Sequence, residues 1–184
     1  MCENISQKID PVIRVNRSMI PPNPMFWTGE AVEGKALHLD LEKVGPSEYN
    51  VTELGHWLYN GQIDKNRACV RGGEIHKYLK RTNTLKTILG LLDLLEIQKM
   101  GITFFRKYFR CWRYLGWKGI VQDRKGRLFV PVIYDSDVVL SVNMNHVLPR
   151  DTVILDWDSC DQNCFTANSP ALSFPSNMVV SPLG

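Results

Sequence analysis

The sequence predicts an α+β fold in which a helical middle segment packs on a small antiparallel sheet. Two observations support this class. Apolar residues recur at helical spacing between residues 74 and 115, and the spacing changes to the two-residue period of strands after residue 118. A chain of 184 residues with 44% apolar and 22% charged residues is long and apolar enough to bury a core.

The first part of the chain predicts two strands and one short helix. A strand is expected within residues 11–20, and the prolines of "PPNP" that follow end it. Residues 35–44 alternate apolar and polar side chains well enough for a second strand. Residues 51–59 then predict a short helix, with Asn50 as its N-cap.

Three helices are predicted in the middle of the chain. The clearest spans residues 84–99, where apolar side chains recur at three- and four-residue steps (Leu85, Ile88, Leu89, Leu92 and Leu95). A shorter helix over residues 74–81 precedes it. A third helix, residues 102–115, follows the break at Gly101.

Strands follow the helices. The stretch "KGIVQDRKGRLFVPVIYD" predicts a hairpin with its tip at residues 124–126, and Pro131 places its own position at a sheet edge or a bulge. Residues 137–144 and 151–157 predict two more strands. The Ser- and Pro-containing tail, residues 158–184, is expected to be flexible alone or to dock extended along the domain.

Charge divides the chain unevenly. Residues 67–127 carry fifteen Lys or Arg against four acids, whereas the segments on either side are net acidic and the whole chain is only +3. We therefore divide the chain into an N-terminal arm with a strand and a short helix (1–66), a basic helical segment with a hairpin and sheet (67–157), and a tail (158–184). Such asymmetry is typical of proteins with an anionic partner.

The stretch "TFFRKYFRCWRYLGWKG", residues 103–119, concentrates this charge. It holds five basic, seven aromatic and no acidic residues. On a helical projection most of the aromatic residues form an apolar arc that is wide enough to face a core, and the cations lie opposite, with Tyr114 and Trp117 among them. Cations without acids at three- or four-residue spacing repel one another, so a purely solvated role is disfavoured.

The order of these elements over residues 72–134 resembles that of winged-helix DNA-binding proteins: a helix, a short turn, a basic amphipathic helix and a basic hairpin. In that arrangement the second helix enters the major groove and the hairpin contacts the backbone. The leading hypothesis is therefore a non-enzymatic nucleic-acid-binding protein, for DNA or RNA. Its expected contacts are Arg106, Lys107, Arg110, Arg113, Tyr114, Trp117, Lys118, Arg124, Lys125 and Arg127.

Other readings of the basic face stay open. A small adaptor or inhibitor would use it on an acidic protein surface. Binding to an anionic membrane surface ranks lower, because the apolar face continues that of a leucine-rich helix that needs a packing partner. A metal-dependent nuclease is a further alternative, with Asp156 and Asp158 on one face of a strand as the candidate catalytic pair.

No other catalytic, metal or cofactor motif stands out. The histidines share no ligand spacing, no serine lies in a nucleophile elbow, and the cysteines lack zinc-finger spacing, so neither a metal nor a cofactor is expected. Five cysteines is an odd number without a disulfide pattern, which favours free thiols. With no signal peptide and no membrane span in the sequence, the expected location is cytoplasmic.

Overall fold

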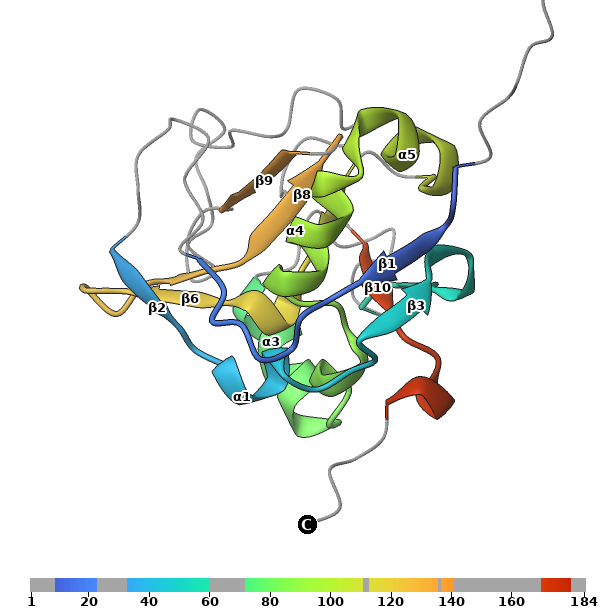
Figure 1. Ribbon diagram of the computed structural model, residues 1–184. Coiled ribbons are helices and arrows are strands. Elements are labelled where there is room, and N and C mark those ends of the chain that lie inside the picture. The colour runs from blue at the N-terminus through green and yellow to red at the C-terminus, as the bar shows by residue number, and fades with distance from the viewer. Residues whose placement is uncertain are drawn as a thin grey trace, which may run out of the picture.

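The structure is a computed structural model that describes residues 9–22, 33–59, 72–110, 113–135, 137–140 and 170–179. Helices and small antiparallel sheets alternate in it, which confirms the predicted α+β class (Figure 1). Its helices are α1 (Leu39–Glu42), α3 (Gly72–Arg81), α4 (Leu91–Lys99) and α5 (Gly101–Tyr108). Its single-turn 3-10 helices are η1 (Val51–Glu53), η2 (Leu85–Thr87), η3 (Trp117–Gly119) and η5 (Ser176–Met178).

The strands form short antiparallel sheets that join distant parts of the chain. They are β1 (Val12–Arg14), β2 (Gly34–Ala36), β3 (Glu48–Asn50), β4 (Gly55–Trp57), β5 (Arg113–Leu115), β6 (Val121–Asp123), β7 (Leu128–Phe129), β8 (Pro131–Tyr134), β9 (Asp137–Leu140) and β10 (Ala171–Ser173). β1 pairs with β3, and β4 with β10. The other sheets have the orders β2-β6-β7 and β5-β8-β9.

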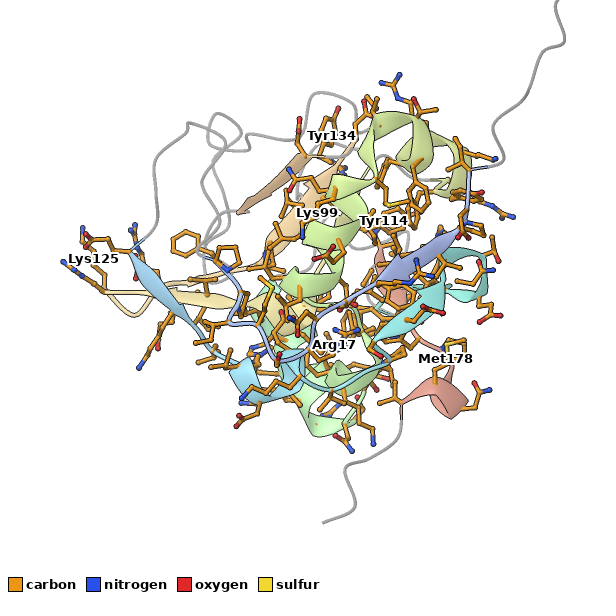
Figure 2. The ribbon with its side chains drawn as sticks, in the orientation of Figure 1. Arg17, Lys99, Tyr114, Lys125, Tyr134 and Met178 are labelled. Carbon is orange, nitrogen blue, oxygen red and sulfur yellow. The ribbon has the colours of Figure 1, made fainter. Side chains whose placement is uncertain are left out.

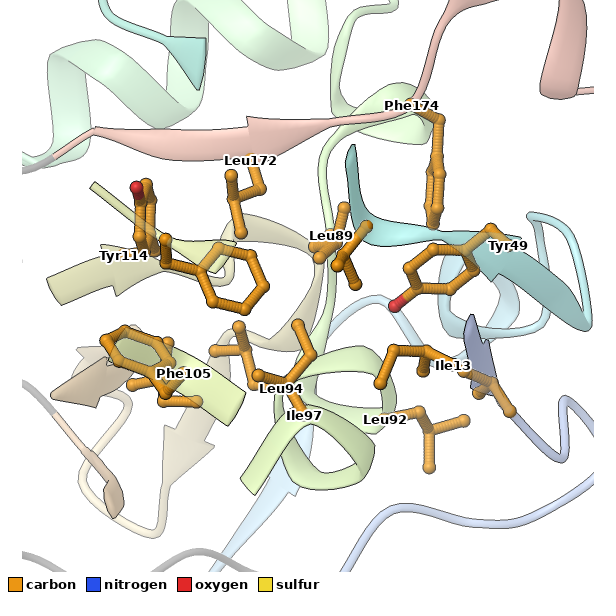
Figure 3. Packing of buried hydrophobic residues seen from close by; sticks show 14 of the residues in the cluster. Ile13, Tyr49, Leu89, Leu92, Leu94, Ile97, Phe105, Tyr114, Leu172 and Phe174 are labelled. Atoms are coloured by element: carbon orange, nitrogen blue, oxygen red, sulfur yellow. The ribbon is translucent and has the colours of Figure 1, made fainter. Parts of the chain in front are cut away.

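The core surrounds α4, which lies at the centre of the molecule (Figure 1). Leu94 and Ile97 of α4 are fully buried and lie close to Phe105 of α5 and Leu172 of β10 (Figure 3). Ile13 of β1 approaches the same helix from another side. Because the N-terminal strands and the β10 segment both pack on this helix, their apolar residues become part of one core.

Several local patterns are confirmed. α3 covers the predicted helix 74–81, and the β6–β7 hairpin has its tip where it was expected, with Gly126 at φ +77°. β1 and β9 lie within their predicted strands. β10 shows that residues 171–173 of the tail dock extended, whereas the predicted strand 151–157 lies outside the described residues.

Three elements differ from their predictions. Asn50 caps a helical turn as expected, by accepting a hydrogen bond from the Thr52 amide (2.9 Å), but the predicted helix 51–59 ends after that turn and continues as β4. The predicted strand 35–44 becomes β2 followed by α1. The predicted helix 84–99 is interrupted before Leu91, because β10 hydrogen-bonds to the chain there: the Leu89 amide donates to Leu172 O (2.9 Å).

The predicted helix 102–115 is wrong beyond its first half. α5 ends at Tyr108, and Phe109 has extended dihedrals (φ −111°, ψ 135°). The chain then forms β5, which pairs with β8 (Arg113 opposite Tyr134). Pro131 was expected at an edge or a bulge. It is instead the first residue of β8, a middle strand, where a missing N–H is tolerated.

A buried ionic cluster joins the N-terminal segment to α4. Asp93 is fully buried and accepts two hydrogen bonds from Arg17 (2.7 and 3.1 Å) and one from the Gly90 amide (3.0 Å). Glu42, also fully buried, accepts hydrogen bonds from the first amides of α4 (2.5 and 3.2 Å). Lys118 donates to Val44 O (2.8 Å). A distant carboxylate therefore satisfies amides that no helical partner can reach.

Burial and charge set the pKa values within the buried ionic cluster. Burial, and then the charge of Asp93, raises the pKa of Glu42 to about 7, although Lys118 and the amide hydrogen bonds oppose that rise. Burial would also raise the pKa of Asp93, but Lys118 and Arg17 outweigh it and the pKa is lowered. Asp93 is therefore the permanent anion of the cluster, and Glu42 is the carboxyl that titrates near neutral pH.

Glu42→Gln is expected to gain stability relative to the wild-type protein as the pH rises from about 4.5 to 7. The folded pKa of Glu42 lies above its ordinary value of 4.5, so the wild-type carboxyl contributes stability that is lost as the pH rises through 7. The change amounts to about 1 kcal/mol per pH unit within this window. Urea unfolding of both proteins at several pH values measures the difference, and groups other than residue 42 contribute equally to both. A difference that stays constant with pH would contradict the prediction.

Candidate nucleic-acid interface

α5 presents cations on the side opposite its buried aromatic residues. Gly101 has φ +83°, a backbone conformation that glycine adopts without strain, and it lets α5 start directly after α4. Phe104 and Phe105 are buried against the core, while Arg106 and Lys107 are exposed. The sequence therefore predicted the two faces of this helix correctly over its length.

The cations at the end of α5 have few acidic neighbours. Arg106 forms a bidentate ion pair with Asp135 (2.8 and 2.5 Å), and its side chain is 66% exposed. The Lys107 ammonium lies 5.2 Å from the centre of the Tyr108 ring. Arg110 is exposed just beyond the helix. A hydrogen bond from Arg106 and its charge lower the pKa of Asp135, so this carboxyl stays ionised.

These three cations line one cleft of about 820 Å³, which we call the basic cleft. One wall is the C-terminal half of α5 and the residues that follow it, and the other comes from η1, β4 and β10. Its lining residues are Val51, Thr52, Leu54, His56, Arg106, Lys107, Tyr108, Phe109, Arg110 and Leu172. The described side chains that line it include no carboxylate, and their positive charge favours anions.

His56 is a cleft residue that was not predicted as part of the site. It lies in β4, and its Nε2 atom is 3.2 Å from the hydroxyl oxygen of Tyr114. Burial, and then the charge of Arg110, lowers the pKa of His56. A neutral His56 can exchange hydrogen bonds with a ligand without adding charge. No local sequence signal places it here, since the pairing of β4 with β10 positions it.

Three of the predicted contact residues are buried and cannot reach a ligand. Tyr114 and Lys118 have 0% of their surface exposed and Trp117 has 1%. The sequence placed Tyr114 and Trp117 among the cations by extending α5 as a helix, but these residues lie in β5 and η3. Arg113 also belongs to β5, is partly buried and opposes Tyr134 of β8.

The hairpin tip carries weaker positive charge than predicted. Arg124 forms an ion pair with Glu33 (2.6 Å), and Arg127 forms one with Asp123 (2.7 Å). Lys125 is exposed at the tip, which lies at the opposite side of the molecule from α5 in Figures 1 and 2. The tip and the basic cleft are therefore separate surfaces.

The candidate catalytic pair of the nuclease alternative, Asp156 and Asp158, lies outside the described residues. Within the described ranges, no group of three or more His, Cys, Asp or Glu side chains is arranged to hold a metal ion. No helix in those same ranges has both the length and the apolar character needed to cross a membrane.

Comparison of this chain with protein-family models, with curated proteins and with solved structures finds no match.

Proposed function

We propose that this protein binds nucleic acid through the basic cleft beside α5. The observation that carries the proposal is the convergence of Arg106, Lys107 and Arg110 on one concave surface. When such cations bind the phosphate groups of a nucleic acid, they displace the counterions held there, and the release of these counterions drives binding. A concave surface brings several phosphates within reach of the cations at once.

The ion pair of Arg106 with Asp135 does not oppose this function. The Arg106 side chain is 66% exposed, so water competes with Asp135 for it and the pair contributes little. A phosphate can therefore replace Asp135 as the partner of Arg106, since the guanidinium fork fits phosphate oxygens equally well. In the part of the chain that the structure describes, neither Lys107 nor Arg110 forms an ion pair with an acidic side chain.

The proposed contacts are to the phosphate backbone and not to base edges. α5 has only eight residues, its cations lie at its end, and Arg110 follows the helix. A recognition helix instead places residues near its N-terminus against base edges in the major groove. We therefore expect binding with little sequence preference, dominated by phosphate contacts.

Binding is expected to weaken steeply with salt. Three phosphate contacts give a slope of log K against log salt of about −2.7 for duplex DNA and about −2.1 for a single strand. Between about 50 and 200 mM salt, the duplex affinity then falls roughly 40-fold. Fluorescence anisotropy of labelled duplex DNA, single-stranded DNA and RNA, titrated at several salt concentrations without added metal, measures the slope and ranks the three ligands.

The same titration separates the alternatives. If none of the three ligands binds at low salt, the proposal is wrong, and an acidic protein surface becomes the expected partner of the basic cleft. Binding with a slope near zero would also contradict a phosphate footprint. The nuclease alternative predicts a different result: the labelled strand is cleaved only after Mg²⁺ or Mn²⁺ is added, and Asp156→Asn abolishes this cleavage.

A further inference from the structure

Two histidines from distant parts of the chain meet outside the basic cleft. His38 precedes α1 and His76 lies in α3, yet their Nε2 atoms are 2.7 Å apart. The ring centres are 5.0 Å apart and the ring planes are tilted by 54°. The two rings therefore meet head-on in a hydrogen bond, in which one Nε2 atom donates its proton and the other accepts it.

The elements that carry this pair are held by the core. Ile75 and Leu79, on either side of His76 along α3, are fully buried, and Leu41 of α1 packs against the same hydrophobic cluster. His76 is 7% exposed, whereas His38 is partly exposed. The pair is therefore preorganised, and solvent reaches it from the side of His38.

Burial disfavours the charged form of both imidazoles. Burial, and then the charge of Lys80, lowers the pKa of His38. Burial, and then the charges of His38 and Lys80, lowers the pKa of His76 to about 4. Neutral imidazole, with a free electron pair on one ring nitrogen, is the form that binds metal ions.

We propose that His38 and His76 form a binding site for a divalent transition-metal ion such as Zn²⁺ or Cu²⁺, with both Nε2 atoms as ligands. In a tetrahedral site with Zn–N bonds of 2.0–2.1 Å, two such nitrogens lie about 3.3 Å apart. To bind the ion, the donor ring moves its proton from Nε2 to Nδ1, both rings turn so that their Nε2 atoms face the ion, and the Nε2 atoms separate by about 0.6 Å. Water completes the coordination. Mg²⁺ and Ca²⁺ are excluded because they require oxygen ligands.

Lys80 is the nearby charge that opposes a bound cation. It is exposed and follows His76 by one helical turn, so its ammonium repels the metal ion. Lys80→Glu reverses this effect and brings a carboxylate to the same face of α3. We expect this variant to bind Zn²⁺ at least several-fold more tightly than the wild-type protein does.

The test is a Zn²⁺ titration of the full chain followed by nitrogen NMR of the histidine side chains. The Nε2 signals of His38 and His76 should shift together with one midpoint, and Mg²⁺ at the same concentration should shift neither. His38→Ala should raise the midpoint for His76 at least tenfold, because one of two ligands is lost. His38 makes no capping hydrogen bond to α1, so this variant should keep its fold, which circular dichroism checks.

His56→Ala is the matched control, since it removes a described histidine that lies outside the pair. It should leave the midpoint unchanged. Zn²⁺ binding that shifts neither His38 nor His76 would overturn the proposal and assign the metal to other side chains, such as the five cysteines. An unchanged midpoint in His38→Ala would overturn it as well. Neither result bears on nucleic-acid binding, which is measured without metal.

Discussion

Asp93→Ala is expected to lower the free energy of unfolding by about 3–5 kcal/mol. Asp93 is fully buried in the first turn of α4, where it accepts hydrogen bonds from Arg17 and from the Gly90 amide. Tyr49 also donates a hydrogen bond to it (3.2 Å). Alanine removes the acceptor and leaves the other groups buried, so their desolvation is no longer compensated.

The size of the effect comes mainly from Arg17. Its side chain is only 10% exposed, and it has no other carboxylate within ion-pair distance in the described residues. Glu96→Ala, on the same helix, is the matched control, because Glu96 pairs with Lys99 at the surface. That change should cost less than about 1 kcal/mol. Urea unfolding of both variants measures the contrast, and equal losses would contradict the role of Asp93.

A double-mutant cycle tests whether the loss arises from the unpaired cation. Arg17→Met removes the charge but keeps much of the apolar side chain. In the Asp93→Ala background this second change should cost much less than it does alone, because Arg17 has then already lost its carboxylate partner. Strictly additive losses would show that the two side chains act independently.

Local sequence patterns predicted the elements that depend on local contacts. The helix at residues 74–81 and the hairpin tip at residues 124–126 follow from periodicity and turn residues, and both are present. The first half of the helix 102–115 is also correct, and with it the exposed positions of Arg106 and Lys107. These residues are the part of the candidate site that sequence alone could place.

Long-range pairing determined what the sequence could not show. The predicted helix 51–59 became β4 because Gly55–Trp57 pairs with β10, more than a hundred residues later in the chain. β5 likewise replaced the end of a helix because it pairs with β8. No window of 10–20 residues contains both β4 and β10, and the whole β5–β8 pairing, from Arg113 to Tyr134, is longer than such a window.

Buried charge escaped prediction for the same reason. Lys118 was expected at a binding surface because lysine is rarely buried without a partner. Its compensating carboxylates, Glu42 and Asp93, lie 76 and 25 positions earlier in the chain. Only the fold brings these three side chains together. The sequence therefore predicted Lys118 at the surface, although it belongs to the core.

Reversing two charges in the basic cleft is expected to weaken nucleic-acid binding strongly. Lys107→Glu combined with Arg110→Glu removes two proposed phosphate contacts, and at about 0.1 M salt counterion release alone predicts a loss of roughly 60-fold for duplex DNA and roughly 25-fold for a single strand. The slope of log K against log salt should also become shallower, by about 1.8 for the duplex. Both residues are exposed, so the stability should change by less than about 0.5 kcal/mol.

The matched control is Arg124→Glu combined with Lys125→Glu at the hairpin tip. It changes the net charge by the same amount, but at a surface well separated from α5 (Figure 2). Neither residue lines the basic cleft, so this double variant should lose much less affinity and keep most of the salt slope. Equal losses in the two double variants would mean that only the net charge matters. In that case the basic cleft would not be the binding site, because a specific footprint requires that position, and not only charge, determine affinity.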